Sequence, residues 1–267
     1  MPTFSFTLEY DGTDFAGWQI QPSVRTAMGV FSDALRALTS EAPALTAAGR
    51  TDSGAHAHGQ VVGCTLERDW ATDELRNALN ATLPADLAVR NVATRNDGFD
   101  ARRDAVDRTY RYLIVCRDGR SPVMRRNAWT VRGPLDVDAM RRAAAHLVGR
   151  HDFAAFGTSP RVGGSTIRNV TSVSVERADF GTAEHGAPVL EAIAITVSAD
   201  AFLRGMMRSF TGALVKIGQG RATTEWLASL VDTAATRDPS LAVAPARGLH
   251  QWSVRYEPAR QDRELAA

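Results

Sequence analysis

The stretch GQVVGCTLERDWATDELRNALNATLPADLAVRNVA, residues 59–93, decides the fold, because it places a strand, a helix and a second strand in close succession. Gly59–Glu67 is rich in β-branched and other apolar residues, which indicates a strand. Thr72–Leu83 carries leucines at helical spacing, and we predict Thr72 as its N-cap. Leu87–Ala93 is a second predicted strand. Together these segments predict a β-α-β unit.

The residues before this stretch extend the same pattern toward the N-terminus. Thr3–Tyr10 alternates as a strand does, and Thr26–Thr39 has the apolar spacing of an amphipathic helix. Pro43–Ala48 indicates a short strand. The first half of the chain therefore reads β-α-β-β-α-β, the split βαβ or ferredoxin-like pattern.

The second half repeats this order with one additional helix. Its predicted strands are Thr109–Cys116, Ile167–Arg177, Val189–Val197 and Gln251–Tyr256. Its predicted helices are Val137–Val148, Ala201–Ile217 and Thr224–Thr233. We expect an α+β fold in which two ferredoxin-like halves, residues 1–105 and 106–260, form a continuous and mainly antiparallel sheet. Helices would cover one face of the sheet, and a central cleft would lie between the halves.

Composition narrows the class of protein. The chain has 267 residues, of which 44% are hydrophobic, so global disorder is excluded. The net charge of +1 gives no bulk excess that would announce a nucleic-acid partner. Cys64 and Cys116 form neither a disulfide framework nor a set of zinc ligands. There is no signal-peptide pattern and no apolar run of the ~18 residues that a membrane span needs, so we expect a soluble, cytoplasmic protein.

The segment GRTDSGAHAHGQ, residues 49–60, carries the strongest candidate for chemistry. Its three glycines allow a loop with unusual backbone angles and close approach of a ligand. Asp52 lies near its centre, with Arg50 two positions earlier. An aspartate can act as a nucleophile or a general base, and a nearby arginine favours the ionised carboxylate. The structural alternative is that Asp52 only caps a turn through its side chain.

The same segment also permits a metal site. Asp52, His56 and His58 could ligate an ion, as in a metal-dependent hydrolase, although the other histidines are scattered. His151 and Asp152 resemble a catalytic dyad, but neighbouring residues rarely face each other, so we interpret them as loop-capping residues. The chain lacks a Walker loop and a dinucleotide-binding fingerprint, and we predict neither a cofactor nor a metal.

Residues 108–112, Arg-Thr-Tyr-Arg-Tyr, interleave arginine with aromatic side chains on a predicted strand. Alternation places Tyr110 on the same face as Arg108 and Tyr112. Such a face suits phosphate contact together with base stacking, and the alternative is an ordinary solvated face.

Seven short blocks, taken together, resemble the tRNA pseudouridine synthase A family and occur in family order along nearly the whole chain. They are Tyr10-Asp11-Gly12, Gly17-Trp18-Gln19, residues 49–57, residues 108–112, His151-Asp152-Phe153, residues 201–208 and Ala244-Pro245-Ala246-Arg247-Gly248-Leu249. The chain departs from the family pattern at Arg103, where Phe is common, and at Asp200, where Asn or Ser is more usual.

The resemblance implies isomerisation of uridine to pseudouridine at positions 38, 39 and 40 of the tRNA anticodon stem-loop, without cofactor or metal. It makes Asp52 the catalytic nucleophile. Tyr110 would stack on the flipped base, Arg208 would pair with the aspartate, and Leu249 would form the apolar wall opposite the tyrosine. Arg50 would hold the RNA backbone or fill the space that the flipped nucleotide leaves.

The resemblance also implies a homodimer in which one tRNA contacts both subunits. Such a dimer would double the basic surface available to the RNA. The alternative function is a catalytically silent RNA-binding module, since doubled ferredoxin-like sheets also bind RNA without acting on it.

Overall fold

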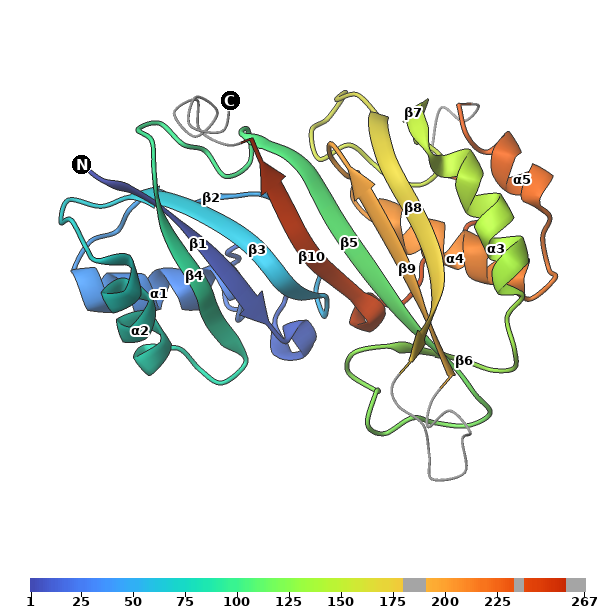
Figure 1. The fold of residues 1–267 in the computed structure, drawn as a ribbon, viewed down its shortest axis with the longest axis horizontal. Helices are drawn as coiled ribbons and strands as arrows, with labels where there is room; N and C mark the ends of the chain where they lie inside the picture. The colour runs from blue at the N-terminus through green and yellow to red at the C-terminus, as the bar shows by residue number, and fades with distance from the viewer. Residues whose placement is uncertain (180–190, 233–237, 258–267) are drawn as a thin grey trace, which may run out of the picture. The chain divides into compact units, whose positions relative to one another are not determined.

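A computed structural model of the chain describes residues 1–179, 191–232 and 238–257 (Figure 1). The chain forms two compact units, one of Met1–Arg108 together with the residues from Gln251 onward, and one of Thr109–His250. The boundary falls inside two strands, β5 (Ala105–Cys116) and β10 (Leu249–Tyr256). The second unit is therefore one continuous segment, whereas the first is built from both ends of the chain.

The first unit contains a mainly antiparallel sheet and two α-helices. Its strands are β1 (Thr3–Tyr10), β2 (Thr46–Ala47), β3 (His56–Thr65) and β4 (Leu87–Arg95), joined by β10. The helices are α1 (Ala27–Thr39) and α2 (Thr72–Thr82), with a short 3-10 turn, η1 (Gly12–Asp14). The strands lie in the order β4-β1-β3-β10, with β2 paired to β3. This confirms the split βαβ connectivity that the sequence predicts.

The two helices of this unit begin in different ways. The side chain of Thr26 accepts a hydrogen bond from the Gly29 amide and caps α1. The prediction of Thr72 as N-cap of α2 is wrong, because Ala71 occupies the cap position without a side-chain hydrogen bond. Two acidic residues in the first turn, Asp73 and Glu74, instead complement the positive end of the helix dipole.

Both helices cover one face of the first unit's sheet (Figure 1). Alternate residues of β1, from Phe4 to Tyr10, are buried in one apolar core with Phe31 of α1 and Leu75 of α2. A smaller cluster forms around Val61 of β3, where Phe99 and Tyr256 pack. The polar segment Asn96–Asp107, which lies between the two predicted halves in the sequence, therefore contributes Phe99 to the packing of the first unit.

The second unit also combines an antiparallel sheet with helices. Its strands are β5, β6 (Trp129–Val131), β7 (Gly149–Asp152), β8 (Ile167–Asp179) and β9 (Glu191–Ala199). Its helices are α3 (Val137–Ala144), α4 (Met206–Gly218) and α5 (Thr224–Ser229), with 3-10 turns η2 (Ala145–Leu147) and η3 (Ala246–Gly248). The order is β5-β9-β8-β7, and β6 pairs in parallel with β5. Helix α3 contacts β8, α4 and α5, and Figure 1 shows the three helices grouped beside this sheet.

Helix α4 is shorter than predicted. The expected helix Ala201–Ile217 begins only at Met206, because Gly205 adopts a left-handed conformation with a φ of 78° and the residues before it are not helical. From Met206 onward nearly every residue of α4 is buried, which is typical of a central helix. Its Phe210 ring packs edge-on against Phe153 and Phe156, with centroids 5.3 and 5.0 Å away.

The α+β class and the mainly antiparallel sheets are confirmed, and the predicted central cleft stays a prediction. Cys64 and Cys116 are buried free thiols, as expected, and burial raises the pKa of Cys64 to about 12. Val189 and Thr233, which bound two predicted elements, lie outside the described residues. The sequence also predicts a frayed tail over Gln261–Ala267, and this range lies outside them too. Within the ranges that the structure describes, no helix is long and apolar enough to cross a membrane.

Candidate active site

The loop that carries Asp52 joins β2 to β3 and is fixed on both sides of that residue. The Trp18 amide donates to the Thr51 carbonyl (3.1 Å), and the Gly54 amide donates to the Phe15 carbonyl (3.3 Å). The hydroxyls of Tyr10 and Thr51 lie 2.8 Å apart in a buried contact. Asp52, itself half-buried, is therefore held between two anchored neighbours.

Two glycines outside the loop permit this close packing. A Cβ on Gly12 would lie 1.8 Å from the Ala55 carbonyl oxygen, which no side chain tolerates. Gly17 has a φ of 93°, and a Cβ there would lie 2.9 Å from the Thr51 carbonyl oxygen. The early blocks Tyr10-Asp11-Gly12 and Gly17-Trp18 thus form the support against which the Asp52 loop is built.

The main chain of the loop turns directly after Asp52. The Ala55 amide donates to the Asp52 carbonyl oxygen at 3.1 Å, so this turn is closed by a backbone acceptor. Gly54 provides the positive φ of 78° that such a turn requires. Arg50, two residues before Asp52, is exposed.

The start of the loop is held by three buried side chains that the sequence did not mark as supports. Gln60 donates to the Gly49 carbonyl (2.8 Å) and accepts from the Gln251 amide group (2.9 Å). The Nε of Arg108 donates to the Ala48 carbonyl at 3.2 Å. A buried amide or guanidinium needs such partners, because an unsatisfied polar group is costly in the interior.

The interpretation of Arg108 as a phosphate contact is wrong. Its side chain is buried and donates to main-chain carbonyls, including that of Ala105 at 2.9 Å. Tyr112 is also fully buried, and its hydroxyl donates to the Pro245 carbonyl at 2.6 Å. Arg108, Tyr110 and Tyr112 are all buried at alternate positions of β5, as the spacing predicts. Arg108 and Tyr112, however, direct their polar groups to main-chain carbonyls of the protein itself.

In the second unit, Tyr110 packs against an aromatic partner that the sequence analysis missed. The ring of Phe202 meets the Tyr110 ring edge-on, with centroids 4.7 Å apart. Phe202 lies in the segment before α4 that was predicted as helix, and its place in the block 201–208 was the available signal. Because Tyr110 is only 7% exposed, this contact fixes the direction of its ring.

The segment 244–249 is a second well-fixed region: Arg208 contacts its first residue, and Leu249 is its last. From the first turn of α4, the Nε of Arg208 donates to the Ala244 carbonyl (2.6 Å), and the Ala244 amide donates back to the Arg208 carbonyl (3.1 Å). Further along, a Cβ on Gly248 would lie 2.6 Å from the Tyr112 ring. The segment 244–248 therefore delivers Leu249, which is buried, at a fixed position at the start of β10.

The two histidines of the candidate metal site have other partners. His56 is buried, and its Nδ1 accepts from the Gly12 amide (3.1 Å) and lies 3.2 Å from an oxygen of Asp11. His58 packs against the ring of Trp252, with centroids 4.7 Å apart. Among the described residues, no group of three or more His, Cys, Asp or Glu side chains is placed to hold a metal ion.

His151 and Asp152 do not form a dyad with each other. Asp152 accepts from the Ala154 amide (2.9 Å), which confirms its capping role. His151 instead contacts Asp232, with Nδ1 and Oδ2 2.6 Å apart, and this hydrogen bond raises the pKa of the imidazole.

Comparison with known proteins agrees with the motif resemblance. The profile described as tRNA pseudouridine synthase matches residues 7–102 and 143–257. Those ranges include Asp52, Arg208 and Leu249, whereas Tyr110 lies between them.

Curated relatives match over nearly their full length. A tRNA pseudouridine synthase A of Geobacter sulfurreducens is 39% identical over 96% of this chain and 100% of its own. Proteins of the same name from Frankia casuarinae and Chloroflexus aurantiacus are 42% and 41% identical, each over 97% of this chain and 90% of their own. The identity and the coverage of both chains are far above what a shared fold alone would produce, and the protein belongs to the tRNA pseudouridine synthase family.

Proposed function

We propose that this pseudouridine synthase acts on positions 38, 39 and 40 of the tRNA anticodon stem-loop, with Asp52 as the nucleophile. Family membership supports tRNA pseudouridine formation as the reaction. The observation that carries the assignment of Asp52 is its half-buried position between the anchored residues Thr51 and Gly54. A nucleophile gains most of its effect from being held in place before the substrate arrives.

The reaction is an isomerisation, and its balance sets what the site must do. The bond between N1 of uracil and C1′ of ribose breaks, the base turns, and C5 bonds to C1′. The proton on C5 leaves and N1 ends with a proton, so no atom is gained or lost and nothing is oxidised. The enzyme must therefore hold a carboxylate for attack, keep the detached base in place and let one proton depart.

The remaining predicted residues have roles in this proposal that suit their settings. Tyr110, its ring fixed by Phe202, would stack on the flipped base, and Leu249 would provide an apolar contact to it. Arg208 would supply positive charge for the reacting carboxylate, and Arg50, which is exposed, would contact the RNA backbone. Flipping a base costs a few kcal/mol, so stacking and backbone contacts that offset it matter.

The proposal includes a cytoplasmic homodimer in which one tRNA contacts both subunits. The supporting argument is electrostatic: a chain of net charge +1 gathers little positive potential alone, whereas two copies present twice the arginine-bearing surface. Light scattering with and without tRNA measures the subunit number directly. A monomer in both conditions would contradict this part of the proposal.

Tritium release tests the reaction and the nucleophile together. Transcripts carrying [5-³H]uridine at only one of positions 38, 39 or 40 should each release one tritium per pseudouridine formed by the wild type. Asp52→Asn and Asp52→Ala should still bind tRNA but lower release by at least about 10³-fold. Asp97→Asn, an exposed aspartate of the same unit, is the matched control and should behave as wild type.

Each contrary result identifies what fails. Release that persists in both Asp52 variants would overturn the nucleophile. Release from only one labelled position would overturn the three-site specificity. Binding without release by the wild type would favour the silent RNA-binding module.

A further inference from the structure

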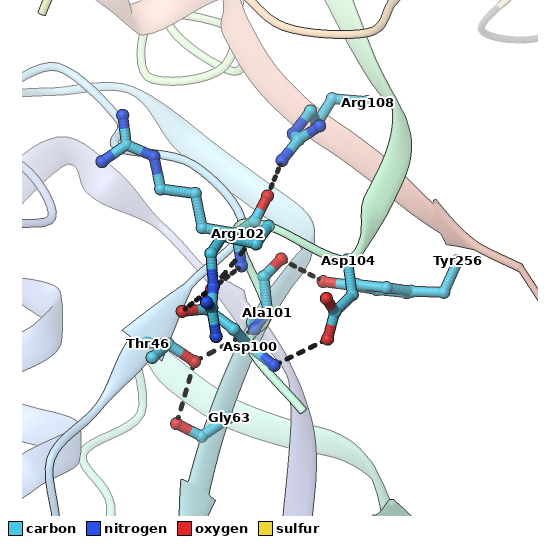
Figure 2. A network of polar contacts seen from close by, with 9 residues as sticks. Thr46, Gly63, Asp100, Ala101, Arg102, Asp104, Arg108 and Tyr256 are labelled. Atoms are coloured by element: carbon cyan, nitrogen blue, oxygen red, sulfur yellow. Dashed lines mark hydrogen bonds and ion pairs between the residues drawn. The ribbon is translucent and has the colours of Figure 1, made fainter. Parts of the chain in front are cut away.

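The buried guanidinium of Arg108 connects two separate stretches of the first unit's main chain. Its Nε donates to the Ala48 carbonyl at 3.2 Å, and its Nη2 donates to the carbonyl of Arg102. Figure 2 shows the second of these hydrogen bonds, with Arg108 above the turn that carries Arg102. One planar, always charged group therefore holds both stretches close together.

The turn that carries Arg102 is itself fixed from several sides (Figure 2). Asp100 accepts from the amides of Arg102 (2.8 Å) and Arg103 (3.0 Å). The Tyr256 hydroxyl donates to the Ala101 carbonyl (2.7 Å), and the Ala101 amide donates to the Thr46 hydroxyl (3.0 Å). The main chain at Arg102 is thus held by strands at both ends of the chain.

Two neighbouring arginines on this turn differ in one respect. Both are exposed, but the Nε of Arg103 lies 3.1 Å from a carboxylate oxygen of Asp100, which offsets its charge. The side chain of Arg102 has no hydrogen-bond or ion-pair partner within residues 1–179, 191–232 and 238–257. A charged side chain on a rigid main chain, left without a counter-charge, is suited to bind an anion.

The other stretch held by Arg108 carries a second arginine of the same kind. Arg50 follows Ala48 by two residues, is exposed, and likewise has no hydrogen-bond or ion-pair partner in the described part of the chain. The common guanidinium of Arg108 thus brings the main chains leading to Arg50 and Arg102 together. Guanidinium groups recognise phosphate by paired hydrogen bonds. Because the two main-chain stretches are held in place in advance, less entropy is lost when the phosphates bind.

We propose that Arg102 binds a phosphodiester of the tRNA beside the one that Arg50 contacts, and that Arg108 is the positioning residue for both. The tRNA as ligand rests on the proposed function, whereas the site itself rests on the contacts around Arg108. Because the chain is nearly neutral, RNA affinity must come from local groups such as this pair.

The salt dependence of tRNA binding tests the proposal, since each lost phosphate contact removes about one unit of slope from log K against log salt. Binding of an unmodified tRNA transcript is measured between about 50 and 250 mM KCl. Arg102→Ala should lower affinity roughly fivefold at low salt and reduce the slope by about one. Its KM should rise with kcat unchanged. Arg103→Ala is the matched control and should leave slope and KM as in wild type.

A wild-type slope in Arg102→Ala, or an equal loss of slope in Arg103→Ala, would overturn the proposal. Both variants change exposed side chains, so folding is not at issue. The binding measurement needs no turnover: a failure to form pseudouridine would count against the proposed function, while the slope would still report on Arg102.

Discussion

The loop around Asp52 and the segment from Leu241 to Leu249 are both held in fixed positions, but by different kinds of contact. Each lacks long regular structure, and each is approached by a glycine on which a Cβ would lie 1.8 Å from a carbonyl oxygen, Gly12 at Ala55 and Gly212 at Ala242. At Asp52 itself the loop is then fixed mainly by main-chain hydrogen bonds, and only its start depends on buried side chains. The other segment is fixed by side chains, in particular those of Arg208 and Tyr112.

This difference decides how mutations can be interpreted. Around Asp52 the main-chain hydrogen bonds of Thr51, Gly54 and Ala55 do not involve the carboxylate, so they remain when that group is changed. Arg208, by contrast, is both a proposed substrate residue and a support of Ala244. A change at Arg208 therefore mixes a chemical effect with a structural one.

Adding one methyl group at either glycine should have the largest effect. Gly12→Ala and Gly212→Ala each force a Cβ into a carbonyl oxygen, and we expect each to lower the free energy of unfolding by about 3 kcal/mol. Urea denaturation measures this change in the free energy of unfolding. Gly98→Ala and Gly220→Ala are matched controls with positive φ but nothing within 4 Å, for which backbone strain predicts about 1 kcal/mol. If all four variants lost the same free energy of unfolding, close packing would not explain the losses at Gly12 and Gly212.

The next comparison separates chemistry from support. Asp52→Asn should abolish turnover and lower the free energy of unfolding by less than Arg208→Lys does, because the main-chain hydrogen bonds beside residue 52 remain. Arg208→Lys should lose activity and also about 1–2 kcal/mol of stability, because the Ala244 carbonyl loses its guanidinium donor. Urea denaturation beside tritium release gives both quantities. If Arg208→Lys were fully stable, the side-chain support described here would be unimportant.

Removing a single hydroxyl tests the same support more gently. Tyr112→Phe deletes the hydrogen bond to the Pro245 carbonyl and should cost about 1 kcal/mol. Burial raises the pKa of Tyr112, so the phenol stays a neutral donor across the working pH range. The comparison variant is Tyr256→Phe, which removes an equivalent bond to Ala101 in the first unit. Tyr112→Phe should also lower kcat, since it lies beside the segment that delivers Leu249, whereas Tyr256→Phe should act on KM alone, through the turn that carries Arg102.

The smallest effect concerns another side-chain support in the second unit. A hydrogen-bond acceptor faces each ring nitrogen of His151: Asp232 at Nδ1 and the Val148 carbonyl at Nε2, 3.0 Å away. The hydrogen bond that His151 donates to Asp232 raises the pKa of the imidazole, so the charged form stabilises the fold. That contribution is complete below the unfolded pKa of about 6.5 and is lost as pH rises through the higher folded pKa.

Thermal unfolding between about pH 6 and 9 should therefore show a decline in Tm that His151→Gln reduces. Hydrogen exchange at the Asp152 amide, which donates to Asp232, gives a local measure of the same contact. An identical pH profile in wild type and His151→Gln would refute this contribution.

Much of the fold could be predicted from local patterns, because strands and helices that bury one face reveal their period. The helix predicted over Thr26–Thr39, which the structure has at Ala27–Thr39, and the alternation of Arg108, Tyr110 and Tyr112 are examples. The late start of α4 at Met206 could not be predicted, since Ala201 and Phe202 are compatible with a helix and only the left-handed conformation of Gly205 separates them from α4. The strands β6 and β7 are too short to show any period.

The candidate residues could be found, but their supports could not. The sequence marks Asp52 through its glycine-rich surroundings, whereas Gln60 and Gln251 are remote in sequence and become partners only in the folded chain. Arg108 illustrates the limit most clearly: its residue type and its aromatic neighbours predict an RNA contact, but burial directs its guanidinium to backbone carbonyls.

The interrupted course of the first unit has a consequence for how the protein matures. On the ribosome Asp52 emerges early. Its loop is held at Gly49 by Gln60, and Gln60 is in turn held by Gln251. Gln251 is made only after the whole second unit, so this support forms late. Strand β10 thus finishes the setting of the loop that carries Asp52. We expect nascent chains that stop before Gln251 to be inactive even with every proposed catalytic residue already present, so modification of tRNA begins only after β10 has been made.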